Sequence, residues 1–188
     1  MEKVIKNDLI DEAKNLCTKI HKDAKYFLDD KELPYYHHCY IVADIVKNYA
    51  ENNINKSFAE ILAYLHDSIE DTKITYDFLQ NNFNKEIADG VFALTKNSNL
   101  PHDQQIIDSL NRIKKQPKEV AIVKMADRIC NLKKIPDFWS DQKCENYLVE
   151  SKLILNELGF ASKNLQNLLT DSITNYKQKI INRKNLYK

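Results

Sequence analysis

Glycine and proline are scarce in this chain of 188 residues, which contains 2 glycines and 4 prolines. Tight hairpins depend on residues that reverse the backbone, so a hairpin-rich β architecture is disfavoured. The glycine-rich loops that cradle phosphates in P-loop and dinucleotide-binding proteins are absent as well. The composition therefore predicts an all-α fold, and the length predicts a single domain spanning residues 1–188.

Net charge and long apolar runs are also lacking. The formal net charge is +1, so bulk electrostatics give no argument for binding to nucleic acid or to a membrane surface. No apolar run approaches the ~18 residues needed to span a bilayer, and the chain starts with a charged amphipathic segment unlike a signal peptide. We therefore expect a cytoplasmic protein. The absence of CxxC spacing predicts buried, reduced thiols at the four cysteines, Cys17, Cys39, Cys130 and Cys144.

What the chain does contain is a cluster of ionisable residues at the end of an apolar run. Residues 61–65 are apolar, and they are followed by His66, Asp67, Glu70 and Asp71. In a helix, residues three and four apart share a face, so the carboxylates repel one another, and the helix dipole also disfavours anions there. The cluster is either a solvated acidic helix end or the cradle of a cation. The apolar run and the histidine favour a cation.

Apolar residues recur at helical spacing along most of the chain. Ser57 and Glu60 fit a capping box, Thr75 fits an N-cap, and Pro117 can open a helix. We expect a loop at residues 29–34. The expected helices are about 7–24, 35–51, one that begins at 57 and carries the acidic cluster, 75–83, 86–95, 104–115, one that begins at 117, 144–158 and 162–187.

Two adjacent histidines lie near the start of the expected helix 35–51, and periodicity separates them. His38 shares a stripe with Ile41 and Val42, so it faces the core, whereas His37 faces the wetter side. A buried imidazole needs a partner, which makes His38 a candidate metal ligand.

A single carboxylate lies in the middle of the most apolar helix. Residues 120–132 are apolar almost all round, which predicts a buried helix, and Asp127 lies within it. A buried carboxylate carries a desolvation penalty of roughly several kcal/mol, so it must be neutralised, paired or bound to a metal. The alternatives are an ion pair with Lys124, Arg128 or another base, and a place in a metal site.

Together the candidate ligands are two imidazoles and two carboxylates, namely His38, His66, Asp67 and Asp127. Such a set suits Mn²⁺ or Fe²⁺, whereas an all-oxygen set would favour Mg²⁺ and a thiolate-rich set Zn²⁺. A bound divalent ion makes its water far more acidic. Glu70 and Asp71 lie one turn beyond the ligands, where they can transfer protons or orient that water.

The four candidate ligands reproduce the H…HD…D pattern of the HD-domain metal phosphohydrolases. The segment LHDSIEDT at residues 65–72 resembles the HDxxEDT signature of the RelA/SpoT-type (p)ppGpp hydrolases, which include small single-domain members. PYYHH at residues 34–38 resembles their PYIxH segment, and KMADRICNL at residues 124–132 resembles their KLADRxxNL helix. The similarity extends from about residue 21 to residue 158 and covers most of the chain.

This resemblance implies an all-helical HD fold and a Mn²⁺-dependent hydrolase that removes pyrophosphate from the 3′ position of (p)ppGpp, giving GDP or GTP. It implies that the four candidate ligands bind the metal and that Glu70 and Asp71 are the catalytic acid pair. Asn131 and Tyr147 match positions that contact the sugar and phosphates of the nucleotide. Lys96 either meets a phosphate or is a solvated loop lysine.

The chain departs from this family at one segment. Family members typically carry HxGQxRK after the first helix, with an arginine that binds the guanine nucleotide, whereas this chain has HKDAKY at residues 21–26. Lys22 or Lys25 could supply the lost charge but not the planar guanidinium fork. Two alternatives follow: an HD-domain phosphatase that acts on another nucleotide, such as NADPH or a nucleoside monophosphate, and a non-catalytic nucleotide-sensing module. The complete set of metal and acid residues argues against the second.

Overall fold

The computed structural model describes residues 2–28 and 31–186, which are predominantly helical. The predicted all-α class is confirmed, with one small β-hairpin added. In chain order the elements are α1 (Glu2–His21), β1 (Lys25–Leu28), β2 (Lys31–Pro34), α2 (Tyr36–Tyr49), α3 (Lys56–Leu65), α4 (Ser68–Asp71), α5 (Tyr76–Asn82), α6 (Lys85–Leu94), α7 (His102–Ile113), α8 (Lys118–Asn131), α9 (Asp141–Leu158), the 3₁₀ turn η1 (Gly159–Ala161) and α10 (Lys163–Leu186).

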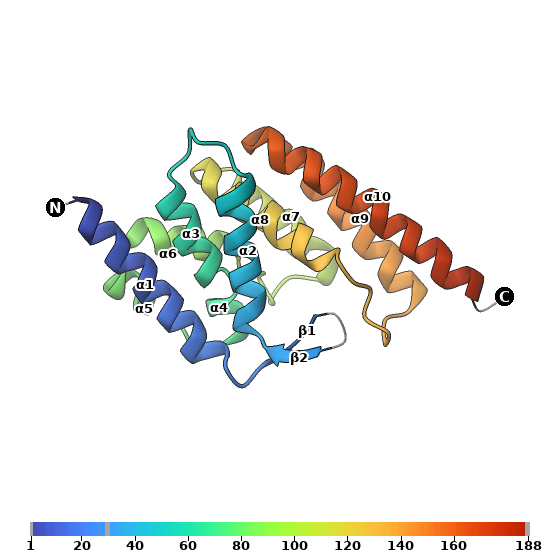
Figure 1. Ribbon diagram of the computed structural model, residues 1–188, viewed down its shortest axis with the longest axis horizontal. Coiled ribbons are helices and arrows are strands. Elements are labelled where there is room, and N and C mark those ends of the chain that lie inside the picture. Colours follow the sequence, from blue (N-terminus) through green and yellow to red (C-terminus); the bar gives the residue numbers. More distant parts are fainter. Residues whose placement is uncertain (1, 29–30, 187–188) are drawn as a thin grey trace.

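Helix α8 forms the centre of the molecule, as its apolar sequence predicts. It begins directly after Pro117, which fixes a backbone angle suited to a helix start and has no amide hydrogen to leave unpaired. Every residue from Glu119 to Cys130 is buried, and α2, α3, α6, α9 and α10 pack around the helix (Figure 1). Side chains from α2 and α3 can therefore meet those of α8 in the core.

The remaining helices lie on either side of α8. α9 and α10 run side by side along one face, and α1 packs against α2 and α3 on the other (Figure 1). The start of α1 and the end of α10 lie at opposite ends of the molecule. Within residues 2–28 and 31–186, no helix combines the length and the apolarity needed to cross a membrane.

The segment after α1 differs from the expectation. The predicted helix through residue 24 ends at His21, and the loop expected at residues 29–34 is largely the strand β2. β1 and β2 pair antiparallel, with Lys25 opposite Pro34. Pro34 cannot donate a ladder hydrogen bond, which an edge strand tolerates. The aromatic residues of β1 favour a strand once a partner lies beside them. Two residues of the expected loop, 29 and 30, lie outside the described part.

Helix starts were predicted with mixed success. Thr75 caps α5 as expected, its hydroxyl accepting from the Phe78 amide. The capping box at Ser57 is wrong, because Asn55 caps α3 and accepts from the Phe58 amide at 3.2 Å. Other boundaries differ by a few residues. The end predicted for the last helix, residue 187, lies outside the described residues.

Candidate active site

The acidic cluster does not lie on one continuous helix. α3 ends at Leu65 and α4 begins at Ser68, so His66 and Asp67 form a turn between them. In an unbroken helix, adjacent side chains point about 100° apart. The turn instead brings them together, with His66 Nε2 3.0 Å from Asp67 Oδ2. The break in the expected helix thus directs both residues toward one point.

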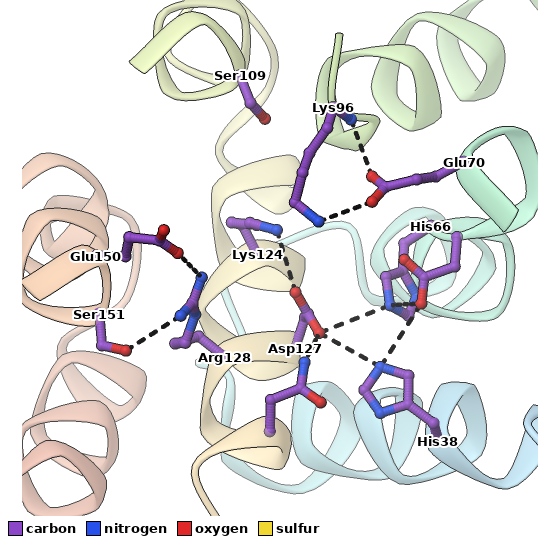
Figure 2. Close-up of polar contacts among 12 residues, drawn as sticks. His38, His66, Glu70, Lys96, Ser109, Lys124, Asp127, Arg128, Glu150 and Ser151 are labelled. Carbon is purple, nitrogen blue, oxygen red and sulfur yellow. Dashed lines mark hydrogen bonds and ion pairs between the residues drawn. The ribbon is translucent and has the colours of Figure 1, made fainter. Parts of the chain in front are cut away.

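Helices α2 and α8 bring two further ligand candidates to that point. His38 Nε2 lies 3.7 Å from Asp67 Oδ2 and 3.3 Å from Asp127 Oδ1. Asp127 Oδ1 also lies 3.9 Å from His66 Nε2 (Figure 2). The ligand atoms of His38, His66 and Asp67 all lie within 4.8 Å of one another, as a group that could hold a metal ion requires. The structure therefore brings together all four residues that the sequence selects.

Both imidazoles direct a buried Nε2 atom toward the cluster, as coordination of a divalent metal requires. Among the described residues, neither His38 Nε2 nor His66 Nε2 has a hydrogen-bond partner, although both atoms are buried. His66 Nδ1 lies 2.8 Å from the Ala63 carbonyl oxygen, which can only accept, so Nδ1 carries the proton and the Nε2 lone pair faces the carboxylates. Buried polar atoms without partners are costly. The donor set fits a metal ion.

Electrostatics at the cluster lead to the same conclusion. Burial lowers the pKa of His66, but the carboxylates of Asp67 and Asp127 outweigh it and raise the pKa overall. Burial raises the pKa of Asp67, and the neighbouring His66 imidazole outweighs it, so the pKa of Asp67 is lowered. A positive charge at this point, whether a proton or a metal ion, would therefore stabilise the buried Asp127 carboxylate and the partly buried Asp67 carboxylate.

Asp127 takes part in an ion pair and also faces the candidate metal site, because its two oxygens have different partners. Oδ2 accepts from Lys124 Nζ at 3.1 Å, which is the ion pair weighed from the sequence. Oδ1 accepts from the Asn131 amide at 2.6 Å and faces both histidines. Arg128 is occupied elsewhere, with its guanidinium 3.8 Å from the centre of the Tyr147 ring.

Glu70 and Asp71 lie in different environments although they are adjacent. Both Glu70 oxygens accept from Lys96, one from the backbone amide at 2.9 Å and one from Nζ at 2.7 Å (Figure 2). Among the residues that the structure describes, none makes such a cation contact with Asp71. Partial burial, followed by the negative charges of Asp67 and Glu70, raises the pKa of Asp71 to about 6. Neighbouring carboxyls with separated environments are typical of acid–base sites.

These groups open onto a cavity of about 710 Å³, large enough for a nucleotide. Seven of the site residues predicted from the sequence line this cavity, namely Asp67, Glu70, Asp71, Lys96, Asp127, Asn131 and Tyr147. The buried histidines lie behind this wall. Polar and aromatic residues that the sequence reasoning did not assign to the site also line it, among them Tyr35, Lys124, Arg128, Trp139 and Lys143.

Comparison with known proteins places this arrangement in a family. Residues 35–132 match the HD domain model. The chain belongs to the HD domain family. It is 28% identical over 143 residues to guanosine-3′,5′-bis(diphosphate) 3′-pyrophosphohydrolase MESH1 of Xenopus tropicalis, covering 74% of this chain and 78% of the relative. MESH1 of Homo sapiens is 24% identical over 162 residues, with 84% and 89% covered.

A solved structure supports the HD fold along most of the chain. It is described as a metazoan ortholog of SpoT that hydrolyzes ppGpp and plays a role in starvation responses. The two chains superpose with a TM-score of 0.78 at 21% identity, over 89% of this chain and 94% of the other. The similarity shows that the folds are shared.

In this HD domain, the structure places Lys25 apart from the other predicted substrate contacts. Its Nζ lies 3.0 Å from Glu32 Oε1 on the outer face of the hairpin, and the side chain is 65% exposed. Successive side chains of a strand point to opposite faces, so its neighbour Tyr26 faces inward. The Tyr26 ring packs 5.5 Å from that of His38.

Tyr35 is the contact that the sequence reasoning missed. Its hydroxyl donates to Asp67 Oδ2 at 2.7 Å, and this is the oxygen that faces both histidines. Tyr35 precedes His38 by three residues, so the two share a face at the start of α2. That spacing could have placed a phenol beside His38, although the contact with Asp67 also depends on the break before α4.

Proposed function

We propose that this HD-domain protein is a metal-dependent phosphohydrolase that removes pyrophosphate from the 3′ position of guanosine tetra- and pentaphosphate, giving GDP or GTP. The observation that carries the proposal is the convergence of two imidazoles and two carboxylates, beside a carboxyl with a raised pKa, at one wall of a nucleotide-sized cavity. The names of the MESH1 relatives supply the reaction.

The metal would be held by His38, His66, Asp67 and Asp127, and a mixed nitrogen and oxygen set of this kind suits Mn²⁺. When bound, a divalent ion supplies Lewis-acid polarisation of the phosphate and makes water more acidic. The chain fixes this set in advance: the Ala63 carbonyl orients His66, the Tyr35 hydroxyl orients Asp67, and Lys124 orients Asp127.

Asp71 moves the proton. The attacking water forms a bond to the phosphorus attached to the ribose O3′, and the P–O3′ bond breaks. Asp71 accepts the proton of the water and returns a proton to O3′, so that pyrophosphate and a free 3′-hydroxyl result. A carboxyl whose pKa is about 6 can both accept and donate a proton near neutral pH.

Glu70 and Lys96 position the phosphates. The two contacts of Glu70 hold the Lys96 ammonium at the cavity wall, where a phosphate oxygen would meet a fixed positive charge. Asn131 and Tyr147 lie on the same wall, where they would contact the sugar and phosphates of the nucleotide.

One observation favours a second candidate, an HD phosphatase acting on another nucleotide such as NADPH or a nucleoside monophosphate. The segment 21–26 contains no arginine, and Lys25 pairs with Glu32 outside the cavity, so the guanine-binding group of the resembled family has no counterpart there. The metal chemistry would be unchanged, but the group transferred to water would be a single phosphate instead of pyrophosphate.

The test uses purified protein with Mn²⁺ and three substrates, ppGpp, NADPH and a deoxynucleoside monophosphate, with phosphate and pyrophosphate quantified separately. We expect pyrophosphate from ppGpp, abolished in His66→Ala and Asp67→Ala. Lys152→Ala, an exposed change on α9, should retain full turnover. Phosphate from NADPH or the monophosphate, without pyrophosphate from ppGpp, would establish the second candidate. Nucleotide binding without turnover would establish the sensing module.

A further inference from the structure

The two candidate ligand histidines have different partners at their second ring nitrogen. His66 Nδ1 meets the Ala63 carbonyl oxygen, which can accept a hydrogen bond but cannot donate one. His38 Nδ1 instead meets the sulfur of Cys130 at 3.4 Å, and a thiol can do both. The tautomer of His66 is therefore fixed by its partner, whereas the tautomer of His38 depends on which way the thiol hydrogen points.

Only one of the two arrangements leaves His38 able to bind a metal. If Nδ1–H donates to the sulfur, the Nε2 lone pair faces Asp67 and Asp127. If the thiol donates to Nδ1, the imidazole hydrogen moves to Nε2 and blocks that position. The first arrangement requires another acceptor for the thiol hydrogen. The Tyr26 hydroxyl oxygen lies 3.6 Å from the Cys130 sulfur and can accept it.

We propose that Cys130 is a positioning residue that holds His38 in the tautomer and orientation needed for metal binding. The proposal rests on the proposed function, because it assigns a role toward the metal site of that reaction. The hydrogen-bond partner of a metal-bound histidine fixes its ring and is commonly a carboxylate or a carbonyl. In this chain a thiol takes that place.

The fold supports this role from three directions. Cys130 follows Asp127 by three residues, so the face of α8 that presents the carboxylate also presents the sulfur. The side chain of Cys130 is buried, with 2% of its surface exposed, so water does not replace it as a partner. Tyr26 of β1 packs against the His38 ring, and its hydroxyl lies beside the Cys130 sulfur.

The first experiment compares the Mn²⁺ affinity of purified wild-type protein with that of Cys130→Val and Cys130→Ser, measured from the electron paramagnetic resonance signal of free Mn²⁺. Valine fills a similar volume without a hydrogen bond, and we expect affinity to fall by about tenfold or more. Serine keeps a hydrogen-bond donor and acceptor, although its C–O bond is shorter than the C–S bond of cysteine. Cys130→Ser should therefore bind Mn²⁺ more tightly than Cys130→Val and less tightly than wild type. Cys144→Val removes an equally buried thiol whose sulfur contacts Arg183, and should bind Mn²⁺ as wild type does.

The second experiment reports on the hydrogen bond itself. In protein loaded with Co²⁺, proton NMR shows a paramagnetically shifted, exchangeable ring N–H for each coordinated histidine. We expect the His38 N–H of Cys130→Val to shift and to exchange faster with water, while the His66 N–H keeps its position. His66 is thus a control within the same molecule, and a purely structural effect of the substitution would move both signals or neither.

The outcomes separate the two proposals. If Cys130→Val binds Mn²⁺ with wild-type affinity and leaves the His38 N–H unchanged, the role of Cys130 is refuted while the hydrolase proposal stands. If Cys130→Val does not fold, the same two measurements are made on Cys130→Ser. Complete loss of the His38 N–H signal in a folded serine variant would refute the expectation that serine partly replaces the thiol. If wild-type protein binds neither Mn²⁺ nor Co²⁺, the proposed function fails first and the role of Cys130 falls with it.

Discussion

At the scale of single residues, the candidate site depends on one oxygen atom. Asp67 Oδ2 accepts from the Tyr35 hydroxyl and lies near both histidines, so the phenol fixes the direction in which the carboxylate presents its lone pairs. Burial, followed by the charge of Asp67, raises the pKa of Tyr35, so the hydroxyl stays protonated and remains a donor. A phenol that stays protonated and donates to the carboxylate is a suitable support for a carboxylate ligand.

Tyr35→Phe removes this single hydrogen bond and leaves the ring in place. We expect Mn²⁺ to bind about tenfold more weakly, because Asp67 loses the partner that orients it. The free energy of unfolding should also fall, by about 1.5–3 kcal/mol, because the lost bond is made to a charged carboxylate. Calorimetric titration with Mn²⁺ measures the first effect, and chemical denaturation of the metal-free protein measures the second. Unchanged Mn²⁺ affinity would show that Asp67 needs no support from the phenol.

Sequence alone could predict the residues whose position depends on their own helix. Periodicity on α2 selects His38 over His37, and the apolar surroundings of Asp127 on α8 identify it as buried; His38 and Asp127 are 1% and 8% exposed. Lys25 lay beyond this reasoning, because its direction follows from the pairing of β1 with β2. The contact between Tyr35 and Asp67 likewise requires the break before α4, which helical spacing does not reveal.

At the scale of elements, the interruption between α3 and α4 is the decisive feature. The sequence of the cluster predicts a cation site, but in an unbroken helix the side chains of His66 and Asp67 would point in different directions. Residue spacing predicts which side chains share a helix face and not where that helix ends. The same limit explains the misplaced cap of α3, because an N-cap forms where the backbone turns, and the backbone turns at Asn55.

The cap of α3 can be tested with a matched pair of variants. Asn55→Ala removes the acceptor for the Phe58 amide and should lower the free energy of unfolding by about 1 kcal/mol. Ser57→Ala lies inside the first turn and should change it by less than about 0.5 kcal/mol. Urea denaturation of both variants measures the difference. A larger loss in Ser57→Ala would instead support the capping box expected from the sequence.

At the scale of the whole molecule, contacts between distant segments hold the shell around α8. Glu51, which follows α2, accepts from the backbone amide of Asn164 at the start of α10, at 2.9 Å. Burial raises the pKa of Glu51, but hydrogen bonds from the Ser162 hydroxyl and from backbone amides outweigh it and lower the pKa overall. A negative charge at a helix N-terminus is favourable. This carboxylate therefore joins α2 to α10.

The pKa of Glu51 is lower in the folded state than in the unfolded state. The stability that Glu51 contributes is therefore fully present above the unfolded pKa of about 4.3 and is lost as the pH falls through the folded pKa. Glu51→Gln should therefore lower the free energy of unfolding by about 0.3–1 kcal/mol at neutral pH, and by less at acidic pH. Denaturation of both proteins between neutral and acidic pH measures this change. A difference that stays constant with pH would mean that the carboxylate charge contributes nothing.

The candidate metal site also belongs to the whole molecule, because its residues come from α2, from the turn before α4 and from α8. The unfolded chain does not assemble this set, so an ion that binds it should stabilise the folded state. Mn²⁺ at a hundred times its dissociation constant would add about 2.7 kcal/mol. For a protein of this size each kcal/mol raises Tm by roughly 2–4 °C, so we expect an increase of roughly 5–11 °C.

His66→Ala supplies the contrast for this measurement. Without its imidazole the set loses one nitrogen ligand, and Mn²⁺ should no longer raise Tm appreciably, although the variant starts from a different Tm of its own. Scanning calorimetry of both proteins, with Mn²⁺ and with a chelator, measures the two increments. The difference between the two increments is decisive, because Mn²⁺ that bound elsewhere on the surface would raise both values of Tm equally. Equal increments would therefore place the ion outside the cluster of His38, His66, Asp67 and Asp127.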